Sequence, residues 1–275
     1  MAPPPNRPAP PSGVCDIAAG LLASLTDLVA SAGSAILAID RRRMSVEGKS
    51  DGSPVTDADL AADRVIADGL KRLAPDIPVV SEERSPPGLA SGNIFFLIDP
   101  LDGTKEFVAG RSEFTVNLAL VADGTPILGI IGAPALGLIW RGVAGRGAER
   151  LSIKDARAEP IHTRPFPPAG QPWVAAVSRS HGDAATEAFI DARPAAVRQT
   201  LGSAVKFAKI AEGTADIYPR LAPTHEWDVA AGCALVAAAG GKMTDPFGAD
   251  LRFGKAEKNF IVPAFIAWGD PSAAP

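Results

Sequence analysis

Two aspartates that follow a short apolar run are the first candidates for chemistry in this chain of 275 residues. Residues 94–98 (Ile-Phe-Phe-Leu-Ile) have the length and composition of a buried strand, and Pro100 is predicted to end it because proline cannot donate to a sheet ladder. Asp99 and Asp102 would then point into one small space, where unpaired anions are costly. Their carboxylates and the Leu101 carbonyl are oxygen ligands that suit a hard cation such as magnesium.

The residues after Asp102 are suited to binding phosphate. Gly103 allows the backbone to come close to a ligand, and Thr104 could open a helix, whose first N–H groups and positive dipole end bind anions. One turn could therefore hold a metal on one side and phosphate on the other. Taken alone, the same residues could equally form an ordinary Asp-Pro turn followed by an Asp-Gly turn.

Acidic residues end or begin three further predicted elements. Glu82 and Glu83 follow a short strand at residues 79–80, which could be a surface turn or a second strand end beside Asp99. Asp59 lies in the first turn of a helix that Thr56 caps, where an acid favours the helix dipole but could also face the metal. Asp228 precedes a helix predicted at residues 229–239, either as its N-cap or as a further metal ligand.

Composition restricts the class of protein. Hydrophobic residues make up 47% of the chain, which allows a sizeable core, and the net charge of −4 argues against a nucleic-acid polymer as partner. No uncharged apolar run reaches the length of a transmembrane helix, and the apolar stretch at residues 14–39 is broken by Asp16 and Asp27. We expect a cytoplasmic protein with two free cysteines.

The pattern of elements predicts a proline-rich disordered tail and two halves. Residues 1–13 form the tail. Residues 14–155 contain two helices against a mainly antiparallel sheet and carry most of the acidic candidates. Residues 156–275 begin with a proline-rich join and then alternate strand and helix.

The acidic blocks together resemble the inositol monophosphatase superfamily over about residues 15–268. The match comprises Glu82-Glu83, the run from Asp99 to Thr104, and Trp227-Asp228 followed by Ala-Ala-Gly. The resemblance is closer to the 3'(2'),5'-bisphosphate nucleotidase branch. The sequence motifs of that branch are similar to residues 53–59, 105–107, 113–117, 178–181 and 211–220. Inositol phosphatases usually carry Thr-Thr-Asn-Phe-like residues where this chain has Thr104-Lys105-Glu106-Phe107.

The resemblance implies a layered αβαβα sandwich with a site between its halves that holds two or three magnesium ions. The implied ligands are Glu82, Asp99 and the Leu101 carbonyl for the first ion, and Asp99, Asp102 and Asp228 for the second. Asp59, Glu82 and Thr104 would act in catalysis, with the Thr104 hydroxyl bonded to Asp59 or Glu82. Substrate would contact Gly103, Thr104, Arg179, Ser180, His181, Lys206, Tyr218, Arg220 and Asp228.

The resemblance also implies a reaction, namely hydrolysis of the 3'-phosphate of adenosine 3',5'-bisphosphate, and possible action on its sulfated form, by metal-activated water. Lithium sensitivity and a role in sulfur assimilation belong to the same expectation, as does a small nucleotide as the partner of a monomer or homodimer, with peripheral membrane association as an option. Inositol 1-phosphate and fructose 1,6-bisphosphate are alternative substrates on this fold. A non-catalytic metal- or phospholigand-binding protein is the alternative of another class.

Overall fold

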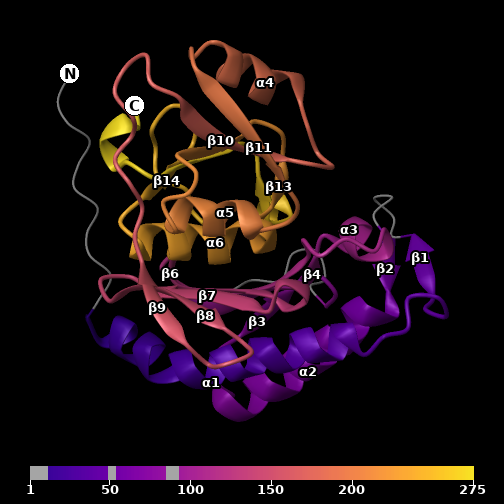
Figure 1. Ribbon diagram of the computed structural model, residues 1–275. Helices are drawn as coiled ribbons and strands as arrows, with labels where there is room; N and C mark the ends of the chain where they lie inside the picture. The colour runs from indigo at the N-terminus through magenta and orange to yellow at the C-terminus, as the bar shows by residue number, and fades with distance from the viewer. Residues whose placement is uncertain (1–11, 49–53, 85–92) are drawn as a thin grey trace.

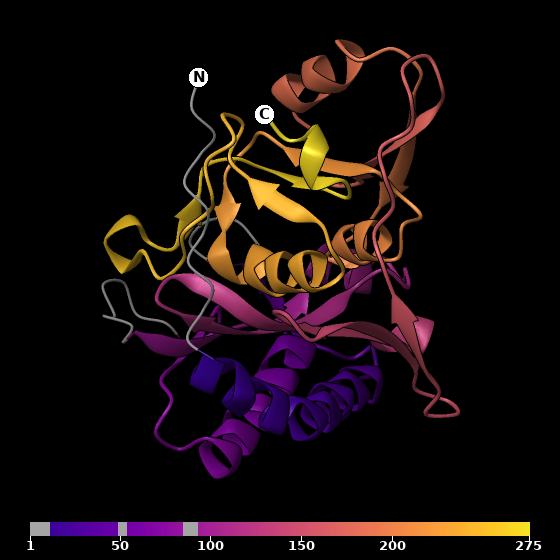
Figure 2. The ribbon, with the colours of Figure 1, turned by 90° about the vertical axis from the view of Figure 1, so that its left-hand side faces the viewer.

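Two helices, a large sheet, two more helices, a smaller sheet and a last helix are stacked in five layers (Figure 1). The computed structural model describes residues 12–48, 54–84 and 93–275. The layers run from α1 and α2 through the seven-stranded sheet to α5 and α6, and then through the five-stranded sheet to α4 (Figure 2). The predicted αβαβα sandwich is confirmed.

The large sheet has the strand order β3-β4-β5-β6-β7-β8-β9. Its first pair is parallel and every other pair is antiparallel. The elements of this half are α1 (Ser12–Leu37), β1 (Val46–Gly48), β2 (Pro54–Thr56), α2 (Asp57–Leu73), β3 (Val79–Ser81), β4 (Ile94–Asp102), α3 (Thr104–Val108), β5 (Thr115–Ala122), β6 (Thr125–Ala133), η1 (Pro134–Leu136), β7 (Leu138–Val143), β8 (Gly147–Ser152) and β9 (Ala158–Ile161).

The smaller sheet has the order β11-β10-β12-β16-β14, and β13 pairs with β15 beside it. The elements of this half are β10 (Trp173–Ser178), α4 (Ala184–Asp191), β11 (Ala196–Leu201), α5 (Val205–Ala211), β12 (Ile217–Arg220), β13 (Thr224–His225), α6 (Glu226–Ala238), β14 (Lys242–Thr244), η2 (Ala256–Lys258), β15 (Ile261–Val262), β16 (Phe265–Trp268) and η3 (Pro271–Ala273).

Burial on both faces explains why β4 is apolar without interruption. Phe95 and Leu97 belong to the core on the side of α5 and α6, while Phe96 and Ile98 belong to the core beneath α1 and α2. A strand covered on both faces needs apolar residues at every position, not at alternate ones. The continuous run therefore places β4 in the middle of the layers.

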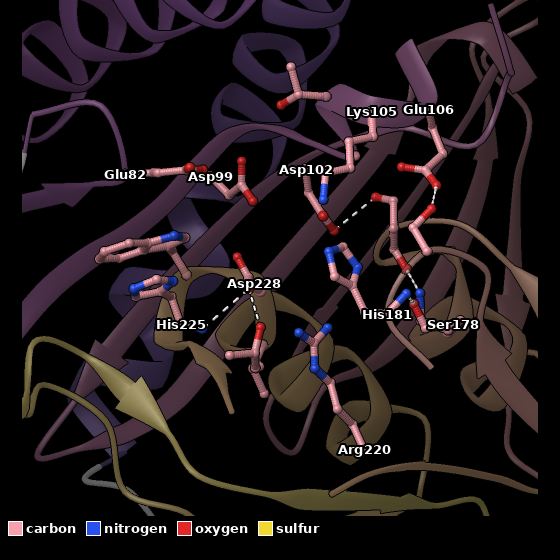
Figure 3. A pocket seen from close by; sticks show the side chains of 18 of the residues that line it. Glu82, Asp99, Asp102, Lys105, Glu106, Ser178, His181, Arg220, His225 and Asp228 are labelled. Atoms are coloured by element: carbon pink, nitrogen blue, oxygen red, sulfur yellow. Dashed lines mark hydrogen bonds between the residues drawn. The ribbon is translucent and has the colours of Figure 1, made fainter. Parts of the chain in front are cut away.

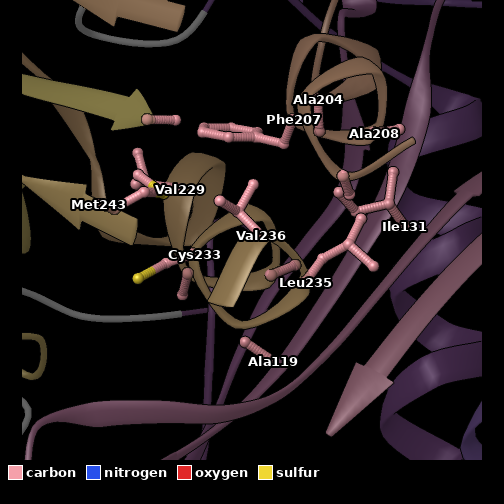
Figure 4. Packing of buried hydrophobic residues seen from close by; sticks show 14 of the residues in the cluster. Ala119, Ile131, Ala204, Phe207, Ala208, Val229, Cys233, Leu235, Val236 and Met243 are labelled. Atoms are coloured by element: carbon pink, nitrogen blue, oxygen red, sulfur yellow. The ribbon is translucent and has the colours of Figure 1, made fainter. Parts of the chain in front are cut away.

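Helix α6 packs directly on the large sheet, as the cluster around Val229, Leu235 and Val236 shows (Figure 4). A side chain at Gly129 on β6 would have its Cβ only 2.1 Å from the carbonyl oxygen of Ala231. Glycine is thus required at this position for the helix to lie so close to the strand. The close approach brings the first turn of α6 to the ends of β3 and β4.

Several predicted boundaries differ from the structure. Strand β4 continues past Pro100 to Asp102, and β9 adds residues 158–161 to the large sheet, beyond the boundary predicted after residue 155. Helix α6 begins at Glu226, so that His225 is its N-cap and Asp228 lies inside the first turn. Ser12 and Gly13 begin α1, whereas the rest of the proposed tail and Ser53 lie outside the described residues.

Among the described helices, α1 alone is long and apolar enough to cross a membrane by the criteria of length and composition. In this fold its buried residues, such as Leu25, Val29 and Ile36, pack with α2 and the large sheet. This packing involves one face of α1, and 28% of its apolar window is buried.

Glu212 at the end of α5 joins the two halves. Its carboxylate accepts hydrogen bonds from Trp140 Nε1 of β7 at 2.7 Å and from Lys209 Nζ at 2.8 Å, with Arg150 of β8 at 3.3 Å. Burial alone would raise the pKa of Glu212, but the hydrogen bonds from Lys209 and Trp140 outweigh it and hold this pKa below its ordinary value. Its ionised form therefore stabilises the folded protein above the ordinary glutamate pKa, and this contribution is lost as the pH falls through the lowered pKa.

We expect Glu212→Ala to lower the free energy of unfolding by about 2 kcal/mol at pH 7, because it leaves the buried indole N–H of Trp140 without an acceptor. Urea denaturation at pH 7 and pH 4 measures the effect, which should be smaller at the lower pH. Glu257→Ala changes an exposed glutamate and serves as the control. Equal denaturation midpoints for the two variants would contradict the role given to Glu212.

Candidate active site

A cavity of about 280 Å³ lies where the ends of β3 and β4 meet the first turn of α6 and the loops of the second half (Figure 3). It contains the site residues from both halves that the sequence indicated, with two exceptions described below. Its polar lining includes Glu82, Asp99, Asp102, Thr104, Lys105, Glu106, Ser178, Ser180, His181, Ser203, Lys206, Tyr218, Arg220, Thr224, His225 and Asp228.

Strand pairing brings the first two carboxylates together. Strands β3 and β4 are parallel with Ser81 opposite Ile98, so Glu82 and Asp99, the next residue on each strand, come together at the end of β3. The pairing of β4 with β5 shifts between Asp99 and Asp102, because Pro100 cannot donate and the residues there form a bulge. The Leu101 N–H bonds the Asp99 carboxylate at 3.0 Å within this bulge. Both aspartates consequently line the cavity.

Asp228 approaches the same space from the opposite side. It is the third residue of α6, and its carboxylate accepts from the His225 N–H at 3.2 Å and from the Thr224 hydroxyl. Acidic residues in a first turn are stabilised by the helix dipole. Asp228 is therefore the N3 residue of a capping box and not the N-cap that the sequence offered as one alternative, and its carboxylate also lines the cavity.

Burial and repulsion between the carboxylates raise the pKa of two of them, Asp99 and Asp102. Burial raises the pKa of Asp99 well above its usual range, and the charges of Glu82, Asp102, Asp228 and Asp59 raise it further. Burial also raises the pKa of Asp102 to about 6, with a contribution from Asp228, although Lys206 and hydrogen bonds from Ser203 and Asn117 oppose it. Like charges in a desolvated site disfavour ionisation, and a bound cation would reverse this effect.

The donor set fits a hard divalent cation. Within residues 12–48, 54–84 and 93–275, no three Asp, Glu, His or Cys side chains are already grouped as a metal site. Glu82, Asp99, Asp102 and Asp228 nevertheless line one cavity together with Leu101, whose carbonyl oxygen lies 3.1 Å from the Thr104 hydroxyl. Oxygen donors without thiolates are the set that magnesium prefers.

Thr104 is connected to α2 through Asp59. The Thr104 hydroxyl lies 3.0 Å from Asp59 Oδ1, and Asp59 Oδ2 accepts from the Thr56 N–H at 2.8 Å and the Thr56 hydroxyl at 2.6 Å. The predicted contact between Thr104 and Asp59 is thus present. Asp59 is buried behind Thr104 and is one of the two predicted site residues outside the cavity lining.

Arg179 is the second exception. Its guanidinium pairs with Glu113 and donates to the Thr200 carbonyl at 3.3 Å, and it does not belong to the cavity lining. The resemblance to the family implied that Arg179 contacts the substrate. The structure shows this charge neutralised by a glutamate from the other half, a contact that no local pattern indicates.

The remaining cations gather at the end of the cavity away from Glu82. Burial lowers the pKa of Lys206 to about 8, and its Nζ donates to the Ser203 carbonyl at 2.6 Å. Arg220 Nε has no hydrogen-bond partner among the described residues. His181 lies between Asp102 and Arg220 in Figure 3, and Tyr218 lies under Lys206 with the ring centre 5.2 Å from Nζ. This end is suited to an anionic group.

Ser203, Ser178 and Glu106 were not predicted as site residues. Ser203 has a left-handed backbone with φ of 51°, and its hydroxyl donates to Asp102 at 2.8 Å. The Gly202-Ser203 pair is a turn signal that could have indicated the unusual backbone. His225 and Trp227, whose rings stack 4.5 Å apart, form an aromatic wall of the cavity that the sequence also did not indicate.

Comparison with known proteins identifies the family. Residues 18–270 match the model of the inositol monophosphatase family. The chain belongs to the inositol monophosphatase family. It is 39% identical over 257 residues to the 3'(2'),5'-bisphosphate nucleotidase CysQ of Escherichia coli K12, an alignment that covers 89% of this chain and 98% of that protein.

Solved structures of family members agree with this assignment. The crystal structure of CysQ from Bacteroides thetaiotaomicron superimposes with a TM-score of 0.75 at 32% identity, covering 89% of this chain and 95% of that one. The IMPase of Thermotoga maritima gives a TM-score of 0.72 at 26% identity, covering 90% and 91%. The inositol monophosphatase fold therefore extends over nearly the whole described chain.

We expect the His181 imidazole of this family member to titrate below its ordinary pKa of 6.5, because burial and then the charges of Arg220 and Lys105 disfavour the protonated ring. The unfolded chain takes up the proton first as the pH falls, so His181 stabilises the folded state less below pH 6.5 than above it. An NMR titration measures the midpoint, with His181→Gln to assign the signal. A midpoint at or above the ordinary value would contradict this environment.

Proposed function

We propose that this protein is a magnesium-dependent phosphomonoesterase that removes the 3'-phosphate of adenosine 3',5'-bisphosphate, giving AMP and phosphate. One observation supports the proposal above all: a single cavity has four carboxylates at one end and Lys206, His181 and Arg220 at the other. A cleaved phosphate would lie at the first end and a second phosphate at the other. The names of the CysQ relatives agree with a substrate that has two phosphates.

The carboxylates are assigned to metal ligation. Glu82, Asp99 and the Leu101 carbonyl would hold one magnesium ion, and Asp99, Asp102 and Asp228 a second. Bound magnesium would lower the pKa of a water molecule and would neutralise the negative charge of the phosphate oxygens. Ser203 and Asn117, at 2.8 and 3.3 Å from Asp102, would keep this carboxylate oriented toward the cavity.

Thr104 is assigned to the attacking water. Because its hydroxyl donates to Asp59, the Thr104 oxygen can accept a hydrogen bond from a water in the cavity. Asp59 in turn is fixed by two donors of Thr56 at the start of α2. The pair would orient water for in-line attack on the phosphorus, a reaction that depends mainly on positioning and charge neutralisation.

Gly103 is assigned to the cleaved phosphate. With φ of 88°, it occupies the left-handed region before α3, and the N–H groups of Gly103 and Thr104 begin this helix. A Cβ at this position would approach Ser203 Cβ to 3.2 Å and the Glu113 carbonyl to 3.3 Å. A residue without a side chain therefore allows the turn to pack while it contacts an anion.

Lys206, Arg220, His181 and Tyr218 are assigned to the nucleotide part of the substrate. The unpartnered Nε of Arg220 and the buried ammonium of Lys206 are donors that an anionic group would satisfy. Arg179 and Ser180 contribute indirectly, since both bond to glutamates of the first half.

Phosphate release from adenosine 3',5'-bisphosphate, inositol 1-phosphate and fructose 1,6-bisphosphate, each with magnesium and then with a chelator, tests the proposal. We expect release from the nucleotide to be fastest by at least about tenfold in kcat/KM and to stop when the chelator is added. Preference for another substrate would keep the metal site but overturn the nucleotide assignment. Release from none would favour a binding protein.

We expect Asp102→Asn to lower kcat by more than about 100-fold while the protein stays folded, because an amide cannot supply the anionic oxygen that the metal needs. Steady-state kinetics and circular dichroism measure the two properties. Asp123→Asn is the matched control, since Asp123 lies in the turn after β5 at φ of 47°, which asparagine also tolerates. A fully active Asp102→Asn protein would exclude the assignment of Asp102 as a ligand.

A further inference from the structure

Glu106 is a buried acid at the substrate end of the cavity, and the mechanism above does not use it. It lies on α3, two residues after Thr104, and is only 3% exposed. Its carboxylate accepts a hydrogen bond from the hydroxyl of Ser180, which belongs to the other half of the molecule (Figure 3). A charge buried in this way requires an explanation.

Direct contact with substrate does not explain Glu106. A carboxylate repels the phosphate groups that the neighbouring cations would attract, so it would weaken binding if it faced the ligand. Arg111 Nη1 lies 3.8 Å from it and offsets part of its charge. The low exposure and the bond to Ser180 indicate that Glu106 stabilises the conformation of the protein and does not bind the ligand.

The bond to Ser180 fixes the loop between β10 and α4 that carries His181. The His181 N–H also donates to the Ser178 hydroxyl at 3.2 Å. Two hydrogen bonds therefore hold the loop next to the imidazole, one at Ser180 and one at the backbone of His181. His181 lines the cavity between Asp102 and Arg220. Release of Ser180 would therefore free the imidazole at the end of the cavity where a second phosphate is proposed to lie.

A second acid from the same segment holds the neighbouring loop. Glu113 accepts from the Gly202 N–H at 3.0 Å and pairs with Arg179. Gly202 also packs so closely that a Cβ there would lie 3.0 Å from Glu106 Cγ and 2.7 Å from the Glu113 carbonyl. The turn that begins with the phosphate-binding residues thus fixes both substrate-side loops of the other half.

We propose that Glu106, acting through Ser180, is a positioning residue that gives this enzyme its preference for substrates with a second phosphate. The inference rests on the proposed function, because it requires a substrate that reaches from the carboxylates to His181. A substrate with the same nucleoside and the same 3'-phosphate, but no 5'-phosphate, would not use the positioned loop.

Adenosine 3',5'-bisphosphate and adenosine 3'-phosphate therefore form the matched pair of substrates. In Glu106→Ala and in Ser180→Ala, we expect the KM for the bisphosphate to rise about tenfold, that for the monophosphate less than twofold, and kcat to stay within about twofold. The double variant should be no worse than either single variant, since both remove one interaction. Glu106→Gln keeps an oxygen acceptor for Ser180 and should recover most of the preference.

Glu149→Gln is the control, because it removes a carboxylate that pairs with Arg141 outside the cavity. It should leave the ratio of the two KM values unchanged. Ser180→Ala makes the smaller change and retains the test if Glu106→Ala does not fold, which thermal denaturation will show.

The outcomes separate the two proposals. If the wild type prefers the bisphosphate but both variants keep this preference, or if the two losses add in the double variant, the role of Glu106 is overturned and the proposed function stands. If KM rises equally for both substrates, the bond is structural only, and the role is likewise overturned. If the wild type hydrolyses neither nucleotide, the proposed function fails and the inference fails with it.

Discussion

Mutual repulsion among buried carboxylates is the constraint on which the rest of this structure depends. Glu82, Asp99, Asp102 and Asp228 share one cavity, and burial together with their like charges raises the pKa of Asp99 well above its usual range. Such an arrangement is unfavourable for the isolated chain and persists only because rigid elements hold it. The parallel β3–β4 pair, the bulge at Pro100 and the first turn of α6 each supply part of that rigidity.

The two halves divide the work of the site between them. The large sheet and α3 supply most of the carboxylates and the turn proposed to bind the cleaved phosphate, while the second half supplies Asp228 and the cationic end. Side chains that cross between the halves determine their alignment: Glu212 reaches Trp140, Ser203 reaches Asp102, and Glu106 reaches Ser180. The proposed metal ligands thus come from both halves, and a few polar contacts between the halves hold them in one cavity.

Local patterns in the sequence predicted those features of the structure that depend on residues close together in the chain. The apolar run before Asp99, the Thr56 cap and the acid-terminated strands indicated the carboxylates of the cavity, whereas the five-layer fold and the substrate-side residues were implied by the resemblance to the family. Strands β8 and β9 were missed because β9 is short and lies at the edge of the sheet, and because β8 beside it carries polar residues such as Glu149 and Arg150. The pairing of Arg179 with Glu113 and the burial of Asp59 depend on segments far apart in the sequence, so no periodicity could indicate them.

The close approach of Gly129 to Ala231 has a consequence for mutational tolerance. Any side chain on this residue of β6 would have to push α6 outward, because its Cβ would otherwise lie 2.1 Å from a backbone oxygen. Asp228 lies one turn earlier on the same helix and would move with it. A glycine that has no chemical group of its own and does not line the cavity therefore sets the depth of an active-site carboxylate, and natural variation there would appear as a change in activity.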